Sequence, residues 1–162
     1  RDFNSGLVID VTQEVPIARY IPTNEAGINN SREGFYINEE GNYFPLSKRY
    51  AERTLLVSGD YFIANAHSSI LKTKDGEKIL SFIHHLNSDP FWQAQITQVN
   101  VNKAGIIELL TSLGNQRIEF GTAEHIESRL KKIQLFYQGV LTADWNKYSK
   151  ISIRYKDQIV CE

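Results

Sequence analysis

The fold is decided by residues 94–120, AQITQVNVNKAGIIELLTSLGNQRIEF. Apolar and polar side chains alternate at its start, so Val99 and Val101 share one face of a strand. Gly105 and Gly114 then mark two turns between further apolar segments. The pattern predicts three neighbouring antiparallel strands, joined as a meander, over residues 94–102, 106–113 and 117–120.

Two amphipathic helices are predicted on either side of this meander. The first covers residues 74–87, and Pro90 prevents it from continuing. The second follows Thr122, a good N-cap residue, and ends near Gly139. Their buried stripes are predicted to be Ile79, Phe82, Ile83 and Leu86 in the first helix and Ile126, Leu130, Ile133 and Tyr137 in the second.

Shorter strands are predicted towards both ends of the chain. Leu7–Val11 alternates like a strand that stops before Pro16, whose missing N–H prevents further pairing in a central strand. Gly41 sits between two aromatic-rich arms that form a hairpin, and residues 22–32 form a loop. The remaining strands are predicted over residues 35–38, 43–46, 54–57, 151–155 and 158–161. Together these elements predict the α+β class, a mainly antiparallel sheet with two principal helices packed on one side.

The composition indicates one folded domain. The 162 residues carry 18 Lys and Arg against 19 Asp and Glu, a net charge of -1 that leaves no field to attract nucleic acid. A hydrophobic content of 41% is enough for an ordinary core. The chain starts at Arg1 and contains no methionine, which indicates a piece of a longer protein. Its longest apolar runs fall far short of the ~20 residues that a membrane-spanning helix needs.

Few residues are arranged for catalysis or metal binding. The four histidines, His67, His84, His85 and His125, are scattered, and no H-x-x-x-H spacing occurs. Ser68 and Ser69 are not part of a G-x-S-x-G elbow, and no glycine-rich phosphate loop is present. Cys161 is the only cysteine and is interpreted as a small apolar strand residue. We expect no catalytic residue, no metal site and no cofactor.

Three distinctive stretches follow one another along the chain. They are LVIDVTQEVPIARY (7–20), YINEEGNYFPLS (36–47) with a strand at 55–59, and IEFG (118–121) followed by ESRLKKIQLFY and YSKISIRYKDQIV (148–160). The set resembles the bacterial cell-division family FtsQ, called DivIB in Gram-positive bacteria. In that family the first stretch corresponds to the last strand of a POTRA domain and a P-x-A-R junction, and the second to the hairpin that opens the β domain.

The resemblance implies a specific parent protein. It has a short cytoplasmic tail, one transmembrane helix in the inner membrane, and POTRA and β domains in the periplasm at the division septum. Residues 1–14 are then the remnant last strand of the POTRA domain, and residues 15–162 the β domain. Family members are noncatalytic divisome scaffolds that join FtsB, FtsL and other divisome proteins to regulate septal peptidoglycan synthesis.

The resemblance also implies a docking surface at the C-terminal edge. A segment of FtsB extends the sheet there through main-chain hydrogen bonds. Arg154 and Tyr155 match the family's partner-binding Arg-Tyr pair, which offers a charge for a partner carboxylate and a ring for an apolar anchor. The residues alone leave a core role open for Tyr155, which alternates with Ile151 and Ile153. The implied partner-binding residues are Arg154, Tyr155, Gln158, Ile159 and Val160.

Two other functions are compatible with the sequence. A periplasmic cell-wall hydrolase would use carboxylates such as Glu108 or Glu119, and it requires a cleft that holds an acid pair with perturbed pKa values. The ordinary interpretation of both residues is a solvent-facing carboxylate in a strand. A POTRA-type factor for outer-membrane protein assembly would require repeated POTRA units upstream.

Overall fold

The fold is a single mixed sheet with helices over one face. The computed structural model describes residues 9–22, 33–47, 49, 51–63, 69–139, 147–155 and 158–162. Within these residues nine strands pair in the order β3-β2-β1-β4-β5-β6-β7-β8-β9, so β3 and β9 are the edges. Five of the eight pairings are antiparallel and three are parallel. The α+β class and the mainly antiparallel sheet are thus confirmed.

The first four strands build one half of the sheet. They are β1 (Pro16–Tyr20), β2 (Phe35–Asn38), β3 (Tyr43–Pro45) and β4 (Leu55–Ser58). The hairpin predicted around Gly41 is confirmed, and Gly41 adopts a φ of 79° in its turn. Strand β1 pairs with β4 in parallel and thereby joins the hairpin to the rest of the sheet. Two short helical segments follow, α1 (Asp60–Ile63) and the 3-10 helix η1 (Ile70–Lys72).

The strand predicted over Leu7–Val11 is wrong where the structure describes it. Residues 9–15 form no strand, and the side chains of Ile9 and Val11 are 71% and 85% exposed. The alternation is typical of a strand, but a strand is stable only where a neighbour pairs with it. Pro16 begins β1 instead of ending a strand, because the first position of a strand tolerates proline. Leu7, Val8 and most of the loop predicted over 22–32 lie outside the described residues.

The central meander is confirmed. It comprises β5 (Ile96–Val101), β6 (Ile107–Thr111) and β7 (Arg117–Gly121), paired in antiparallel. The helix before it, α2 (Gly76–Ser88), also agrees with the prediction. Pro90 does end α2, but it also occupies the first turn of an additional helix, α3 (Pro90–Gln95). The carboxylate of Asp89 caps α3 by accepting a 2.8 Å hydrogen bond from the Phe91 N–H.

The C-terminal part contains α4 (Ile126–Gly139), β8 (Lys150–Ser152) and β9 (Val160–Cys161). Helix α4 begins four residues after Thr122, so the predicted N-cap is wrong. The Glu124 N–H instead donates to the Thr122 carbonyl, and His125 adopts a left-handed φ of 53° directly before the helix. This extra turn delays the helix start.

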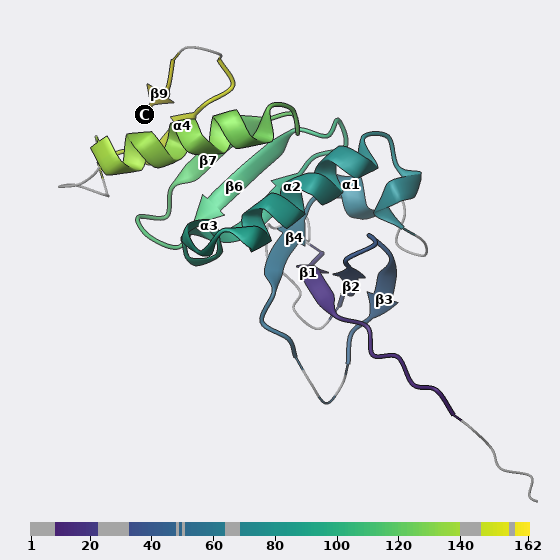
Figure 1. Ribbon diagram of the computed structural model, residues 1–162. Helices are drawn as coiled ribbons and strands as arrows, with labels where there is room; N and C mark the ends of the chain where they lie inside the picture. The colour runs from purple at the N-terminus through teal and green to yellow at the C-terminus, as the bar shows by residue number, and fades with distance from the viewer. Residues whose placement is uncertain are drawn as a thin grey trace, which may run out of the picture.

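The core lies between the sheet and its helices (Figure 1). The ring centroids of Phe82 on α2 and Phe120 on β7 are 4.7 Å apart, and both side chains are fully buried. The predicted stripes are buried except for Ile126, which is half-buried. On the opposite face, Asn100, Glu108 and Glu119 lie side by side on consecutive strands. The two principal helices therefore pack on one side of the sheet, as predicted, and these polar side chains lie on the other side. None of the described helices is both long and apolar enough to cross a membrane.

Candidate partner-binding edge

The predicted docking residues lie around β9, the last strand of the sheet in the described part of the chain. Lys150 and Glu162 exchange two backbone hydrogen bonds of 3.0 and 2.9 Å, which fix the pairing of β8 with β9. Cys161 then lies opposite Ile151, and Val160 lies opposite Ser152. Strand β9 thus has one side attached to β8, and no strand of the described residues pairs with its other side.

The register shows which backbone groups face outward. Antiparallel ladders alternate between hydrogen-bonded and non-hydrogen-bonded pairs. Because Lys150 and Glu162 are a hydrogen-bonded pair, Val160 is also turned towards β8. Cys161, and Ile159 two residues before it, therefore direct their N–H and C=O groups away from β8. These are the groups that an added strand would use.

The side chains at this edge divide between the two faces of the sheet. Ile159 and Cys161 are half-buried and pack against the core, whereas Val160 is 38% exposed. Tyr155 is 55% exposed, although Ile151 and Ile153 are buried, so the alternative of a core role for Tyr155 is wrong. The alternation fails because β8 ends at Ser152 and the chain leaves the sheet before Tyr155. Arg154 and Gln158 are also exposed.

Lys132 of α4 connects the two halves of the predicted site. Its ammonium group donates hydrogen bonds of 2.8 Å to the carbonyl oxygen of Tyr155 and 2.8 Å to that of Gln158. The two residues between them, Lys156 and Asp157, lie outside the described part of the chain. Figure 1 shows β9 beside α4, which places these partners within reach. The helical pattern marks Lys132 only as polar, so nothing in the sequence indicated this contact.

Lys150 forms two ion pairs beside the same edge, on the open face of the sheet, which the helices do not cover. Lys150 lies 3.0 Å from the Glu119 carboxylate and 3.9 Å from that of Glu162. The hydrogen bond from Lys150 holds the pKa of Glu119 below its usual value, and Glu119 in turn raises the pKa of Lys150. Both groups are therefore charged at neutral pH.

A buried hydrogen bond anchors α4 above the sheet. The Tyr137 hydroxyl donates to the Gln116 side-chain oxygen at 2.9 Å, and both residues are buried. Burial raises the pKa of Tyr137 to about 12, so the hydroxyl keeps its proton. Burial also raises the pKa of the Cys161 thiol, which favours the unreactive protonated form. Tyr137 and Cys161 therefore contribute to the packing of the domain and not to a reaction.

Of the two carboxylates proposed for a hydrolase, Glu119 does not have the electrostatic surroundings of a proton donor. Glu108 and Glu119 are direct cross-strand neighbours on the open face. A proton donor needs a raised pKa, but the pKa of Glu119 is lowered by Lys150. The described residues contain no group of three or more His, Cys, Asp and Glu side chains placed to hold a metal ion, and His67 and Ser68 lie outside them.

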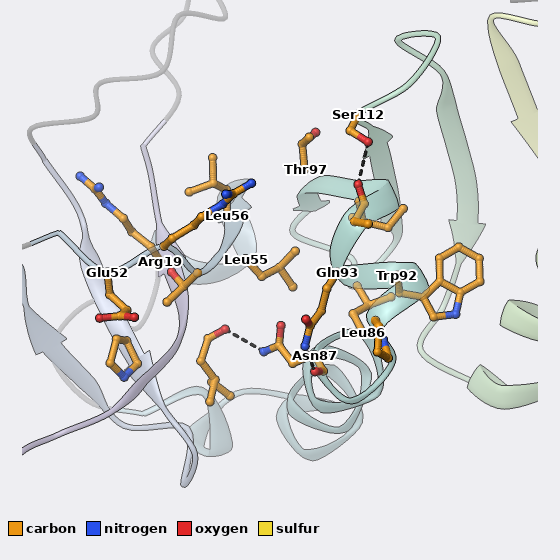
Figure 2. Close-up of a pocket in the computed structure, with 17 residues that line it drawn as sticks. Arg19, Glu52, Leu55, Leu56, Leu86, Asn87, Trp92, Gln93, Thr97 and Ser112 are labelled. Atoms are coloured by element: carbon orange, nitrogen blue, oxygen red, sulfur yellow. Dashed lines mark hydrogen bonds between the residues drawn. The ribbon is translucent and has the colours of Figure 1, made fainter. Parts of the chain in front are cut away.

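A cleft lies elsewhere, where β4 separates from β5. It has a volume of about 850 Å³ and is lined by residues of β1, β4, β5, α2 and α3. Figure 2 shows Leu55 and Leu56 between Glu52 on one side and Gln93 on the other. Glu52 is the only carboxylate among the described lining residues, so the cleft does not supply the acid pair that a glycoside hydrolase needs.

Comparison with protein families identifies the family of the chain. The model of the family described as FtsQ/DivIB, C-terminal related, matches residues 16–162. This range begins at the first residue of β1 and includes β9 and the whole candidate edge. A search of curated proteins gave no match.

Proposed function

The chain belongs to the FtsQ/DivIB C-terminal related family of divisome-associated domains, and on that premise we propose that it is a noncatalytic scaffold that binds FtsB. A segment of FtsB, in a complex with FtsL, adds a strand to β9. This contact helps to regulate septal cell-wall synthesis, at the periplasmic face of the inner membrane and at the division site. The domain then works through protein partners and needs no cofactor.

The observation that supports the proposal is the outward direction of the Ile159 and Cys161 peptide groups at the edge of the sheet. An exposed edge strand invites aggregation, and proteins keep one mainly when a partner uses it. The other edge is less suitable. Strand β3 has three residues and ends in Pro45, which has no N–H to donate.

Side chains next to β9 provide specificity for the partner. The backbone of an added strand pairs in the same way whatever its sequence, so selectivity comes from side-chain anchors. The exposed Tyr155 ring offers a large apolar surface to a partner side chain. Arg154, also exposed, offers a guanidinium group to a partner carboxylate.

The N-terminal segment is proposed to belong to another domain of the parent protein. Ile9 and Val11 are both more than half exposed, although β-branched apolar residues normally lie in a sheet. We assign residues 1–14 to the last strand of an upstream POTRA domain and residues 15–162 to the β domain. An upstream transmembrane helix would anchor the parent protein.

Site-specific photo-crosslinking in dividing cells tests the partner. A photoreactive amino acid at Val160 of the full-length protein should form a crosslink to FtsB, because this side chain borders the free edge. The same amino acid at Thr97, an exposed residue on β5, is the control and should form none. Equal crosslinking from both positions, or none from Val160, contradicts the proposal.

The absence of catalysis is tested separately. The purified domain is incubated with peptidoglycan, glycan and peptide substrates, with and without zinc. No turnover that scales with protein concentration is expected. Saturable hydrolysis that is abolished by one carboxylate or histidine substitution would favour the hydrolase.

A further inference from the structure

We propose, on the basis of the docking function proposed above, that Lys132 is a positioning residue that orders the β9 edge before the partner binds. The residue lies on α4, outside the strands that make the edge. It holds the backbone at two points shortly before β9, the carbonyl of Tyr155 and the carbonyl of Gln158. Its role is to fix the positions of the Tyr155 ring and of the backbone groups that the partner contacts.

The contact has the geometry of a clamp. One ammonium group binds two carbonyl oxygens, of Tyr155 and Gln158, at 2.8 Å each. Hydrogen bonds from a charged donor are stronger than those between neutral groups. Both hydrogen bonds are exposed to solvent, so the clamp acts by joining two points of the chain to one helix and not through burial. The chain is therefore fixed to α4 at Tyr155 and again at Gln158.

The edge needs such a support because β9 is very short. It comprises Val160 and Cys161 and has a neighbour on one side within the described residues. Short strands at sheet edges open locally at little cost in free energy. The Gln158 carbonyl immediately precedes Ile159, the first residue with an outward N–H. Fixing this carbonyl in the free domain reduces the conformational entropy that is lost when the partner binds.

The same clamp sets the position of the aromatic anchor. Lys132 holds the main chain of Tyr155 at its carbonyl oxygen. The exposed ring is therefore attached to a backbone that α4 keeps in place. In this way one lysine aligns the side-chain anchor at Tyr155 with the backbone edge that begins after Gln158.

Lys131 supplies a matched control. It carries the same charge on the adjacent position of α4 and is exposed. It forms no hydrogen bond or ion pair in the described part of the chain. A Lys131→Met variant therefore changes net charge and helix composition as Lys132→Met does, but it leaves the clamp intact.

Two readouts test the proposal in parallel, with Lys132→Met, Lys132→Arg and Lys131→Met compared with the unmodified domain. The first is amide hydrogen exchange without partner at Val160 and Glu162, with Ile153 as an internal reference because its N–H donates to Glu119 within the sheet. The second is the affinity for the periplasmic segment of FtsB, by calorimetry. We expect Lys132→Met to accelerate exchange at Val160 and Glu162 and to weaken binding by about tenfold. Lys132→Arg should restore both, and Lys131→Met should change neither.

Each other outcome overturns the proposal in a distinguishable way. Unchanged exchange in Lys132→Met shows that the clamp does not order the edge. Faster exchange with unchanged affinity shows that the ordering is irrelevant to docking. Faster exchange at Ile153 as well indicates general loosening of the domain. If the unmodified domain does not bind the segment, the docking function itself is wrong, and Lys132 has no docking role whatever the exchange rates are.

Discussion

Val160 of β9 and Ser152 of β8 face each other as a hydrogen-bonded pair, so the Val160 backbone is already used within the sheet. The residues on either side of Val160 have their backbone groups turned outward. Neighbouring positions of one short strand therefore differ in what they contribute. One supports the fold, and the next is available to a partner.

Proline substitution separates these two contributions. Ile159→Pro removes an outward donor, so it should weaken binding of the FtsB segment by about tenfold or more while the melting temperature changes little. Val160→Pro removes a bond to β8 and should lower the melting temperature. Calorimetry and thermal melting of both variants make the comparison, with Ile159→Ala as the control for the lost side chain. Undiminished affinity in Ile159→Pro would show that this N–H does not face the partner.

The Glu119–Lys150 pair predicts a pH dependence of stability. The folded state lowers the pKa of Glu119, so its carboxylate stabilises the fold above the pKa of the unfolded chain. This contribution is lost as pH falls through the folded pKa. Glu119→Gln should therefore reduce the free energy of unfolding at neutral pH, and the difference from the unmodified domain should shrink towards about pH 3. Urea unfolding at both pH values measures it. A difference that is the same at both would show that the ion pair is not its source.

The buried hydroxyl of Tyr137 predicts a stability loss. Tyr137→Phe removes the donor to Gln116 in a place that water does not reach, which should cost about 1–2 kcal/mol of unfolding free energy. Tyr148→Phe is the control, because the Tyr148 hydroxyl has no hydrogen-bond partner in the described part of the chain and its ring is half-buried. Denaturant unfolding should show a clear loss for the first variant and little for the second. Equal losses would mean that the hydrogen bond contributes nothing.

Local patterns predicted most of the elements. The meander, the hairpin and the stripes of α2 and α4 follow from periodicity and turn residues, which act over a few positions. The alternation at Ile9 and Val11 predicted a strand that does not form. A strand needs a neighbouring strand to pair with, and the local pattern gives no information about one. Pro90 was interpreted only as a stop, whereas proline also suits the first turn of a helix, here α3.

The docking edge was predicted only in part. The resemblance indicated Arg154 and Tyr155 as partner-binding residues, and both are exposed. Which of Ile159 and Val160 faces outward depends on the register between β8 and β9, and a shift of one residue would reverse it. Lys132 was missed because its contacts join α4 to backbone carbonyls 23 and 26 residues away. Such contacts exist only in the folded chain.

Calorimetric titration of the domain with the periplasmic segment of its own FtsB tests the central claim most directly. We expect saturable binding that falls roughly thirtyfold in Arg154→Ala and in Tyr155→Ala, with melting temperatures unchanged. Leu113→Ala is the control, since Leu113 is 54% exposed, close to the 55% of Tyr155, but lies in the turn between β6 and β7. It should bind like the unmodified domain. If the segment does not bind, or if both edge variants bind it with undiminished affinity while melting normally, the β9 edge is not the docking site.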